Sequence, residues 1–198
     1  KLPNVKKIAK MCALIREHQP DTTIVVGGHI AGITNPDAHF DADYVVRGEG
    51  VRWFRRFLGE NVDQPVNHPC LPSAINTRTM GIDLTYVKRD TAAALIPSVG
   101  CPIGCNFCSS SATFGGKGKH IDFYETGDEL FDIICQLEER MKVWSFMVMD
   151  ENFLLHRRRA LRLLDLMRTH EKPWAFYVFS SANTINTYSI EQLIALGI

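Results

Sequence analysis

A repeated order of apolar strand followed by amphipathic helix is the feature that most restricts the folds open to this chain. From residue 92 onward this order occurs three times. Strands that alternate with helices form parallel sheets, because a helix must carry the chain back before the next strand can pair. The pattern therefore predicts an α/β fold, either a (β/α) barrel or a doubly wound sheet. The predicted strands are 93–99, 143–149 and 174–179, and the predicted helices include 130–141, 160–167 and 190–194.

Two of these helices carry a recognisable start. Thr126 followed by Glu129, and Ser189 followed by Gln192, have the form of a capping box. The strand 143–149 is apolar except at Ser145, which is typical of a parallel strand covered on both faces. A complete (β/α) barrel takes roughly 250 residues, so we expect about half of one here, and we expect the chain to be a piece of a longer protein.

The first third of the chain has its own α/β pattern. Apolar residues at helical spacing begin at Val5 and include Cys12, which we expect to be a packing residue. An apolar run at 22–26 then leads into a glycine pair, and a second short strand is predicted at 44–46. Three prolines then fall within eight residues, from Pro65 to Pro72, and periodicity is lost. The predicted organisation is a first domain over 1–75, a linker over 76–91 and a second domain over 92–198.

Composition excludes several classes of protein. Hydrophobic residues make up 45% of the chain, which is typical of a globular protein, and the 22 basic residues balance the 22 acidic ones. A net charge of zero gives no support for binding nucleic acid through bulk positive charge. No apolar run approaches the roughly 20 residues that a membrane span needs. We expect no membrane span and, with no targeting segment recognised and cysteines that do not suggest disulfides, a cytoplasmic location.

The strongest chemical signal is a C-x3-C-x2-C loop directly after the strand 93–99. Cys101, Cys105 and Cys108 supply thiolates, which are the ligands that iron–sulfur clusters require, and Gly100 and Gly104 allow tight turns. Three thiolates leave one iron of a 4Fe–4S cluster open to a substrate. Two other readings stay open: a structural zinc site with a fourth ligand, and cysteines that only pack. Candidates for the fourth zinc ligand are Cys70, His68 and His120.

This loop resembles the cluster motif of the radical S-adenosylmethionine superfamily, over residues 92–198. The resemblance implies a partial TIM-type barrel, of which this chain holds the first half. It also implies a 4Fe–4S cluster on Cys101, Cys105 and Cys108, whose open iron binds S-adenosylmethionine and whose electron cleaves it to a 5′-deoxyadenosyl radical. Further contacts to S-adenosylmethionine are implied for Phe107, for Asp150 and Glu151 after the second strand, and for Ser180 after the third. The usual glycines before the acidic residue are replaced here.

The first third resembles the C-terminal half of a Rossmann-like cobalamin-binding domain. The matching segments are Ile24–His29, with Gly27 and Gly28, and Asp43–Gly50. The resemblance implies cobalamin as a further cofactor, with the backbone at Gly27 and Gly28 close to its nucleotide tail. The alternative is a first domain that keeps the fold and binds no corrinoid. The cobalt-ligating segment of the family does not occur in this sequence.

The expected function is radical chemistry on an unactivated carbon, with methyl transfer as the leading outcome if cobalamin binds. The expected partners are a small-molecule or lipid-like substrate and an electron donor such as flavodoxin or ferredoxin. No acid or base directed at the substrate is recognisable. Arg157–Arg159 near a helix start suggest an anionic group nearby, while a solvated basic face is the simpler interpretation. From a different class, a zinc-stabilised module without catalytic activity remains an alternative.

Overall fold

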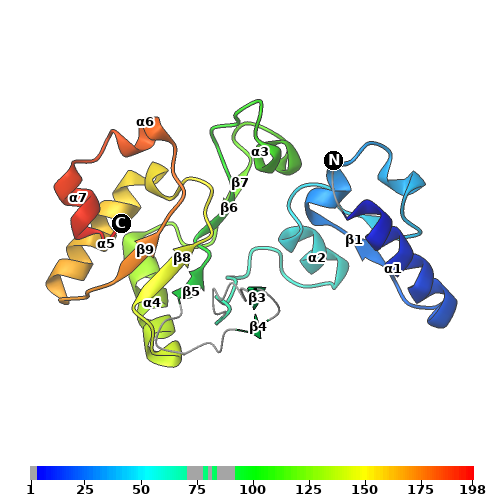
Figure 1. Cartoon of the computed structure of the whole chain (residues 1–198), viewed down its shortest axis with the longest axis horizontal. Coiled ribbons are helices and arrows are strands. Elements are labelled where there is room, and N and C mark those ends of the chain that lie inside the picture. Colours follow the sequence, from blue (N-terminus) through cyan, green and yellow to red (C-terminus); the bar gives the residue numbers. More distant parts are fainter. Residues whose placement is uncertain (1–3, 71–77, 80–81, 84–91) are drawn as a thin grey trace. The chain divides into compact units, whose positions relative to one another are not determined.

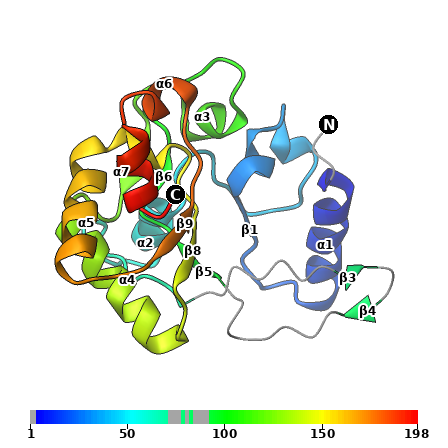
Figure 2. The ribbon, with the colours of Figure 1, turned by 60° about the vertical axis from the view of Figure 1, so that its left-hand side comes forward.

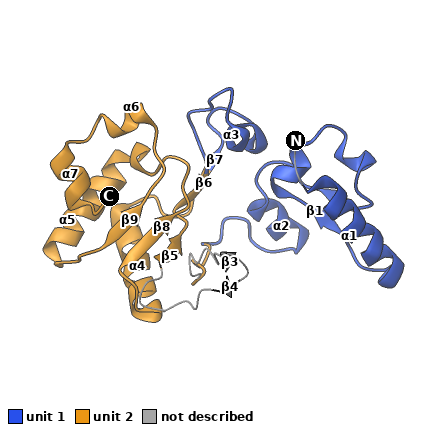
Figure 3. Ribbon diagram, in the orientation of Figure 1, with its two compact units in different colours: residues 1–65, 100–120 blue, residues 66–99, 121–198 orange. Residues whose placement is uncertain are grey.

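The computed structural model describes residues 4–70, 78–79, 82–83 and 92–198 (Figure 1). Within these ranges the chain is mixed α/β, with short strands and parallel sheets, as the alternation predicts. It divides into two compact units (Figure 3): unit 1 holds 1–65 and 100–120, and unit 2 holds 66–99 and 121–198. Over the same ranges, no helix has the length and apolar character that crossing a bilayer would require.

Unit 1 begins with the predicted helix and two paired strands. Helix α1 (Val5–His18) ends before Pro20, and strands β1 (Val25–Val26) and β2 (Tyr44–Val45) pair in parallel. Helix α2 (Val51–Phe57) follows. The core of this unit contains Cys12, Ile24, Val26 and Phe40, so Cys12 is a packing residue, as its place on the apolar stripe predicts. Two short 3-10 helices, η1 (Gly28–Gly32) and η2 (Pro36–Ala38), lie between the strands.

Unit 2 is built on a three-stranded parallel sheet. Strands β5 (Ala92–Leu95), β8 (Ser145–Val148) and β9 (Ala175–Tyr177) lie side by side in chain order. Helices α4 (Gly127–Met141) and α5 (Arg157–Thr169) connect them and lie beside the sheet in both Figure 1 and Figure 2. The connection from β8 to β9 runs through α5, which is the βαβ arrangement, whereas the connection from β5 to β8 also contains the cysteine loop and the rest of residues 96–126 before α4.

The two helices cover the same face of this sheet. Leu95, Val148 and Phe176 project on that face and belong to one buried cluster with residues of both helices. The opposite face carries the partly buried Met147 and Tyr177, whose side chain is 64% exposed. The expectation that strand 143–149 is covered on both faces is therefore wrong for the residues described, because both connecting helices pack on one side.

The strand predicted over 93–99 is two strands. Strand β5 ends at Leu95, and β6 (Ser98–Gly100) forms a separate two-stranded sheet with β7 (His120–Asp122). The break falls at Ile96–Pro97, because proline has no N–H to donate to a continuous ladder. The cysteine loop thus follows β6 rather than the central sheet strand.

Helix starts agree closely with the sequence. Thr126 caps α4 and Ser189 caps α7 (Ile190–Ala195), and both are complete capping boxes. The amide of Thr126 donates to the Glu129 carboxylate and lowers the pKa of that side chain.

The sequence does not predict the short helices α3 (Ser109–Phe114) and α6 (Ala182–Ile185). Most of the predicted linker 76–91 lies outside the described residues, and within it β3 (Arg78–Thr79) and β4 (Ile82–Asp83) pair antiparallel.

Candidate functional site

The cysteine loop lies in unit 1 between β6 and α3. Its three thiols are not in disulfides, and all three residues are partly exposed. The amide of Cys108 donates to the Cys105 carbonyl at 3.0 Å, and the amide of Ala112 donates to the Cys108 carbonyl at 3.1 Å. The loop therefore ends in a turn that runs directly into α3.

Two glycines shape this loop. Gly100 and Gly104 have φ values of +83° and +72°, in the left-handed region that favours glycine. A Cβ on Gly104 would lie 2.5 Å from the Cα of Lys117, so the loop packs against the backbone that follows α3. A Cβ on Gly100 would lie 2.8 Å from the carbonyl oxygen of Lys119. The prediction that both glycines permit tight turns is confirmed.

The donor set of the loop is three thiols. Thiolates are the ligands that a 4Fe–4S cluster takes, each at a different iron, so three of them fit such a cluster and leave one iron open. A structural zinc ion also takes thiolates but needs a fourth ligand to complete its tetrahedron.

Two of the residues considered as a fourth zinc ligand have other partners within unit 2. The Nε2 atom of His68 accepts a hydrogen bond from the Ile96 amide at 2.9 Å, and its Nδ1 atom lies 2.8 Å from the Pro69 carbonyl. Burial lowers the pKa of His68, which keeps the ring neutral. The sulfur of Cys70 lies 3.8 Å from the Arg140 guanidinium. Both ring nitrogens of His68 are thus used inside the protein.

The aromatic residue before the last cysteine is almost fully exposed. Phe107 has 92% of its surface accessible, although a phenyl ring normally gains by burial. It lies on the loop itself, beside Cys108. Among the described residues, no ring contact involves Phe107, and a contact of its ring with S-adenosylmethionine stays a prediction.

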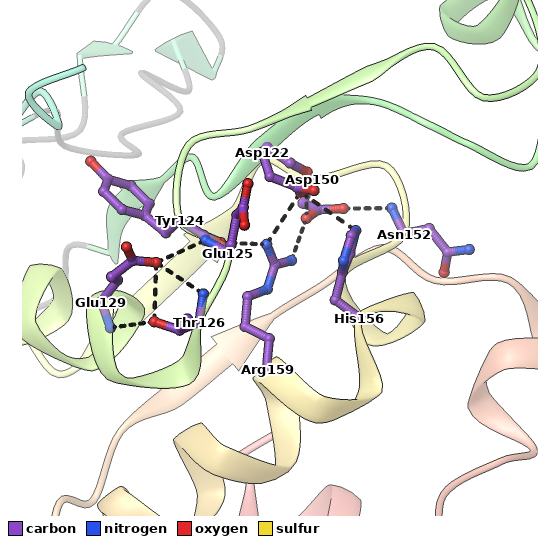
Figure 4. Close-up of polar contacts among 10 residues, drawn as sticks. Asp122, Tyr124, Glu125, Thr126, Glu129, Asp150, Asn152, His156 and Arg159 are labelled. Atoms are coloured by element: carbon purple, nitrogen blue, oxygen red, sulfur yellow. Dashed lines mark hydrogen bonds and ion pairs between the residues drawn. The ribbon is translucent and has the colours of Figure 1, made fainter. Parts of the chain in front are cut away.

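Asp150 sits at the centre of a buried polar network in unit 2 (Figure 4). Its Oδ2 atom accepts hydrogen bonds from the Ser98 hydroxyl at 2.7 Å and the Arg159 guanidinium at 3.0 Å. Its Oδ1 atom accepts a hydrogen bond from the backbone amide of Asn152 at 2.8 Å. Asp150 is only 3% exposed, so its carboxylate is occupied by the chain's own donors. Glu151, the next residue, is exposed.

Asn152 links the segment after β8 to the segment after β9. Its side-chain oxygen accepts from the Ser180 hydroxyl at 2.7 Å and from the Ser181 amide at 3.1 Å. Its side-chain nitrogen Nδ2 donates to the Thr184 hydroxyl at 3.4 Å. Asn152 is 4% exposed, whereas Ser180 is only partly buried. Two segments that the resemblance assigns to S-adenosylmethionine are therefore held together by one asparagine.

The three arginines at the start of α5 have different surroundings. Arg159 is 2% exposed and also donates to the Tyr124 carbonyl at 3.0 Å, so the interpretation of a solvated basic face is wrong for this residue. Arg157 lies over the Tyr188 ring, with 5.5 Å between the guanidinium carbon and the ring centroid. Arg158 is exposed. The triplet therefore does not act as one cationic patch, because its third member neutralises a buried carboxylate.

The glycine pair of unit 1 follows β1. Gly28 has a φ of +73° and open space where a Cβ would project, whereas Gly27 has an extended backbone, and a Cβ there would lie 3.8 Å from Val46. His29 is exposed, and its Nδ1 atom lies 3.0 Å from the Thr113 hydroxyl. His29 and Thr113 line an open cavity of about 400 Å³ together with Gly32, Ser109 and Ala112.

Three residues of the Asp150 network were not singled out as partners from the sequence. Ser98 ends up beside Asp150 although 52 residues separate them, and Arg159 and Asn152 complete the group. The only signal for them is position, because each lies near a strand end or a helix start.

Comparisons with family models, with curated proteins and with solved structures find no match for this chain.

Proposed function

We propose that this chain belongs to a radical S-adenosylmethionine enzyme and that Cys101, Cys105 and Cys108 bind a 4Fe–4S cluster. The observation that carries the proposal is the loop itself: three partly exposed thiols, outside any disulfide, on a turn that two glycines hold in place. Thiolates are the ligands such clusters need. A trio without a fourth local cysteine leaves one coordination position for a substrate.

The arrangement of unit 2 supports the proposed partial TIM-type barrel. Strands β5, β8 and β9 follow in chain order, and helices α4 and α5 pack on one face of their sheet. In a barrel every helix lies outside the sheet, whereas a doubly wound sheet has helices on both faces. The uncovered face of the sheet would then line the barrel interior, where the exposed side chains of Met149, Tyr177 and Phe179 would meet a substrate.

The roles of the residues follow from their places. When bound, the cluster would supply an electron to S-adenosylmethionine, and the resulting radical would abstract hydrogen from an unactivated carbon. The three cysteines anchor the cluster, and Phe107 offers an exposed ring beside them. Glu151 offers a carboxylate to a cationic group, and Ser180 offers a hydroxyl oxygen. The remaining task of the chain is to hold these groups in place and to exclude water from the reacting atoms.

We further propose that unit 1 is the C-terminal part of a Rossmann-like domain that binds cobalamin. The support is a parallel β1–β2 pair and, directly after β1, a glycine with positive φ at position 28, where backbone can approach a ligand without a side chain between them. With corrinoid bound, methyl transfer to a small-molecule or lipid-like substrate is the expected reaction, with flavodoxin or ferredoxin as electron donor. A unit 1 that binds no corrinoid is the competing proposal.

Anaerobic reconstitution with iron and sulfide tests the cluster. We expect broad brown absorbance and iron with acid-labile sulfide in the unaltered chain, and loss of both in Cys101→Ala, Cys105→Ala and Cys108→Ala. Cys135→Ala is the matched control, because Cys135 is also a partly buried free thiol but lies on α4, outside the loop. Colourless protein, or zinc without sulfide, would contradict the proposal and favour the zinc-stabilised module.

Corrinoid binding is tested separately on the same protein. Incubation with cobalamin followed by desalting should leave a corrinoid absorbance with the unaltered chain, and Gly28→Val should reduce it. No retained corrinoid in a preparation that does hold the cluster would favour the competing proposal of a unit 1 without this cofactor.

A further inference from the structure

A continuous chain of hydrogen bonds, buried at its Ser98 end and partly buried at its Ser180 end, connects three segments of unit 2. It runs from Ser98 in β6 to Asp150 after β8, then through the Asn152 amide and side chain to Ser180 and Ser181 after β9. The first three of these residues are at most 4% exposed. The parallel strands β8 and β9 therefore have their carboxyl ends fixed to one another by side chains as well as by the sheet.

The network includes a buried ion pair, between Arg159 and Asp150, that is not needed to fill the core. The Arg159 guanidinium lies 3.0 Å from Asp150 and 3.6 Å from Asp122, and its side chain is 1% exposed. Buried ion pairs are often no more stabilising than apolar residues of the same volume, because both charges lose their hydration. The pair does fix the orientation of the Asp150 carboxylate. Because Oδ1 of Asp150 accepts from the backbone amide of Asn152, the fixed carboxylate also holds the backbone at Asn152 in place.

The hydroxyl of Ser180 has a defined polarity as a result. Its proton is directed at the side-chain oxygen of Asn152, at 2.7 Å, so the hydroxyl oxygen is left to accept hydrogen bonds. This oxygen therefore suits a ligand that presents donors, such as an ammonium group or ribose hydroxyls, better than one that presents a carboxylate.

We propose that Asp150, Asn152 and Arg159 are positioning residues that set Ser180 to receive a donor group of S-adenosylmethionine. This inference rests on the proposed function. It also changes the role of Asp150: the carboxylate that the resemblance assigns to S-adenosylmethionine is instead occupied by Ser98, Arg159 and Asn152 and acts through them.

The test uses the reconstituted chain and S-adenosylmethionine as the probe. Asn152→Ala removes the side-chain hydrogen bonds to Ser180, Ser181 and Thr184. Because these bonds hold Ser180 and do not touch the ligand, we expect the KM for S-adenosylmethionine in its reductive cleavage to rise about tenfold. The iron content and kcat should change far less. Thr169→Ala is the control, since it removes a side-chain hydrogen bond of unit 2 that lies outside this network, at the exposed end of α5. Its KM should match that of the unaltered chain.

Two further measurements guard against a variant that merely folds badly. Ser98→Ala removes a different link of the chain and should raise the same KM while leaving the far side of Asn152 intact. Backbone hydrogen exchange at Ser181 should speed up in Asn152→Ala and remain slow in Thr169→Ala. A chain that binds cluster and cleaves S-adenosylmethionine, with an unchanged KM in Asn152→Ala, overturns this inference alone. A chain that never holds a cluster overturns the proposed function and this inference with it.

Discussion

At the scale of single residues, helix α5 contains two arginines that pair with aspartates in different surroundings. Arg159 and Asp150 are buried together, with side chains 1% and 3% exposed. Arg162 and Asp128 form a shorter pair, 2.6 Å apart, whose side chains are 51% and 56% exposed. Water screens the second pair, whereas the first has only protein around it. The shorter contact is therefore the less important one for stability.

Replacing each arginine by methionine measures this difference. Arg159→Met leaves a buried carboxylate without its cation, and we expect it to lower the free energy of unfolding by about 3–5 kcal/mol. Arg162→Met should lower it by about 1 kcal/mol or less. Urea denaturation followed by circular dichroism provides both values. Equal losses from the two variants would show that burial does not make the Arg159 pair more important for stability.

At the scale of elements, two glycines in and after the cysteine loop differ in how much space surrounds them. Gly104 has a positive φ and also faces the backbone of Lys117, at 2.5 Å from a Cβ position. Gly116 has a positive φ of +97° and nothing within 4 Å of the same position. An alanine at the first site is both strained and blocked, while an alanine at the second is only strained.

This contrast predicts a difference in cluster binding between two alanine variants. Gly104→Ala should reduce the iron bound after reconstitution about tenfold, because the loop must move away from the backbone at Lys117. Gly116→Ala carries the same kind of backbone strain without the contact and should lose much less. Iron analysis after desalting, with unit 2 checked by far-ultraviolet circular dichroism, is the measurement. If both variants bind iron alike, close packing of the loop does not matter for the cluster.

Helix starts and strand breaks differ in how well the sequence predicts them. The capping boxes at Thr126 and Ser189 are predicted correctly because all their contacts lie within three residues. The break between β5 and β6 is not predicted, although Pro97 is visible in the sequence. Whether a proline ends a strand or bends it depends on which neighbour each half pairs with, and here β5 pairs with β8 while β6 pairs with β7.

At the scale of the whole molecule, His68 joins a segment before the central sheet to the end of its first strand. Its ring accepts a hydrogen bond from the amide of Ile96, directly after β5. The neutral ring is required for this contact, and burial lowers the pKa of His68 from its ordinary value of 6.5. The folded state therefore binds the proton less readily than the unfolded chain does.

The pH dependence of stability follows from this sign. The contribution of His68 is fully present above pH 6.5, and it is lost as the pH falls through the lowered pKa of the folded state. We expect the free energy of unfolding to fall between about pH 7 and pH 5. His68→Gln should flatten that part of the curve, because glutamine offers an acceptor that does not titrate there. Urea unfolding at several pH values provides the comparison, and an unchanged slope in the variant would assign the effect to other groups.

The sequence by itself determined the α/β order, the starts of α4 and α7, the packing role of Cys12 and the glycine turns of the cysteine loop. Each of these depends on residues close together along the chain, or on the conformational freedom of a single residue. Only the tertiary structure decided that Asp150 and Arg159 are buried partners, that Asn152 holds Ser180, and that one face of the sheet stays uncovered. The two polar contacts join groups 9 and 28 residues apart, and the burial of a polar side chain depends on what every neighbouring element leaves open.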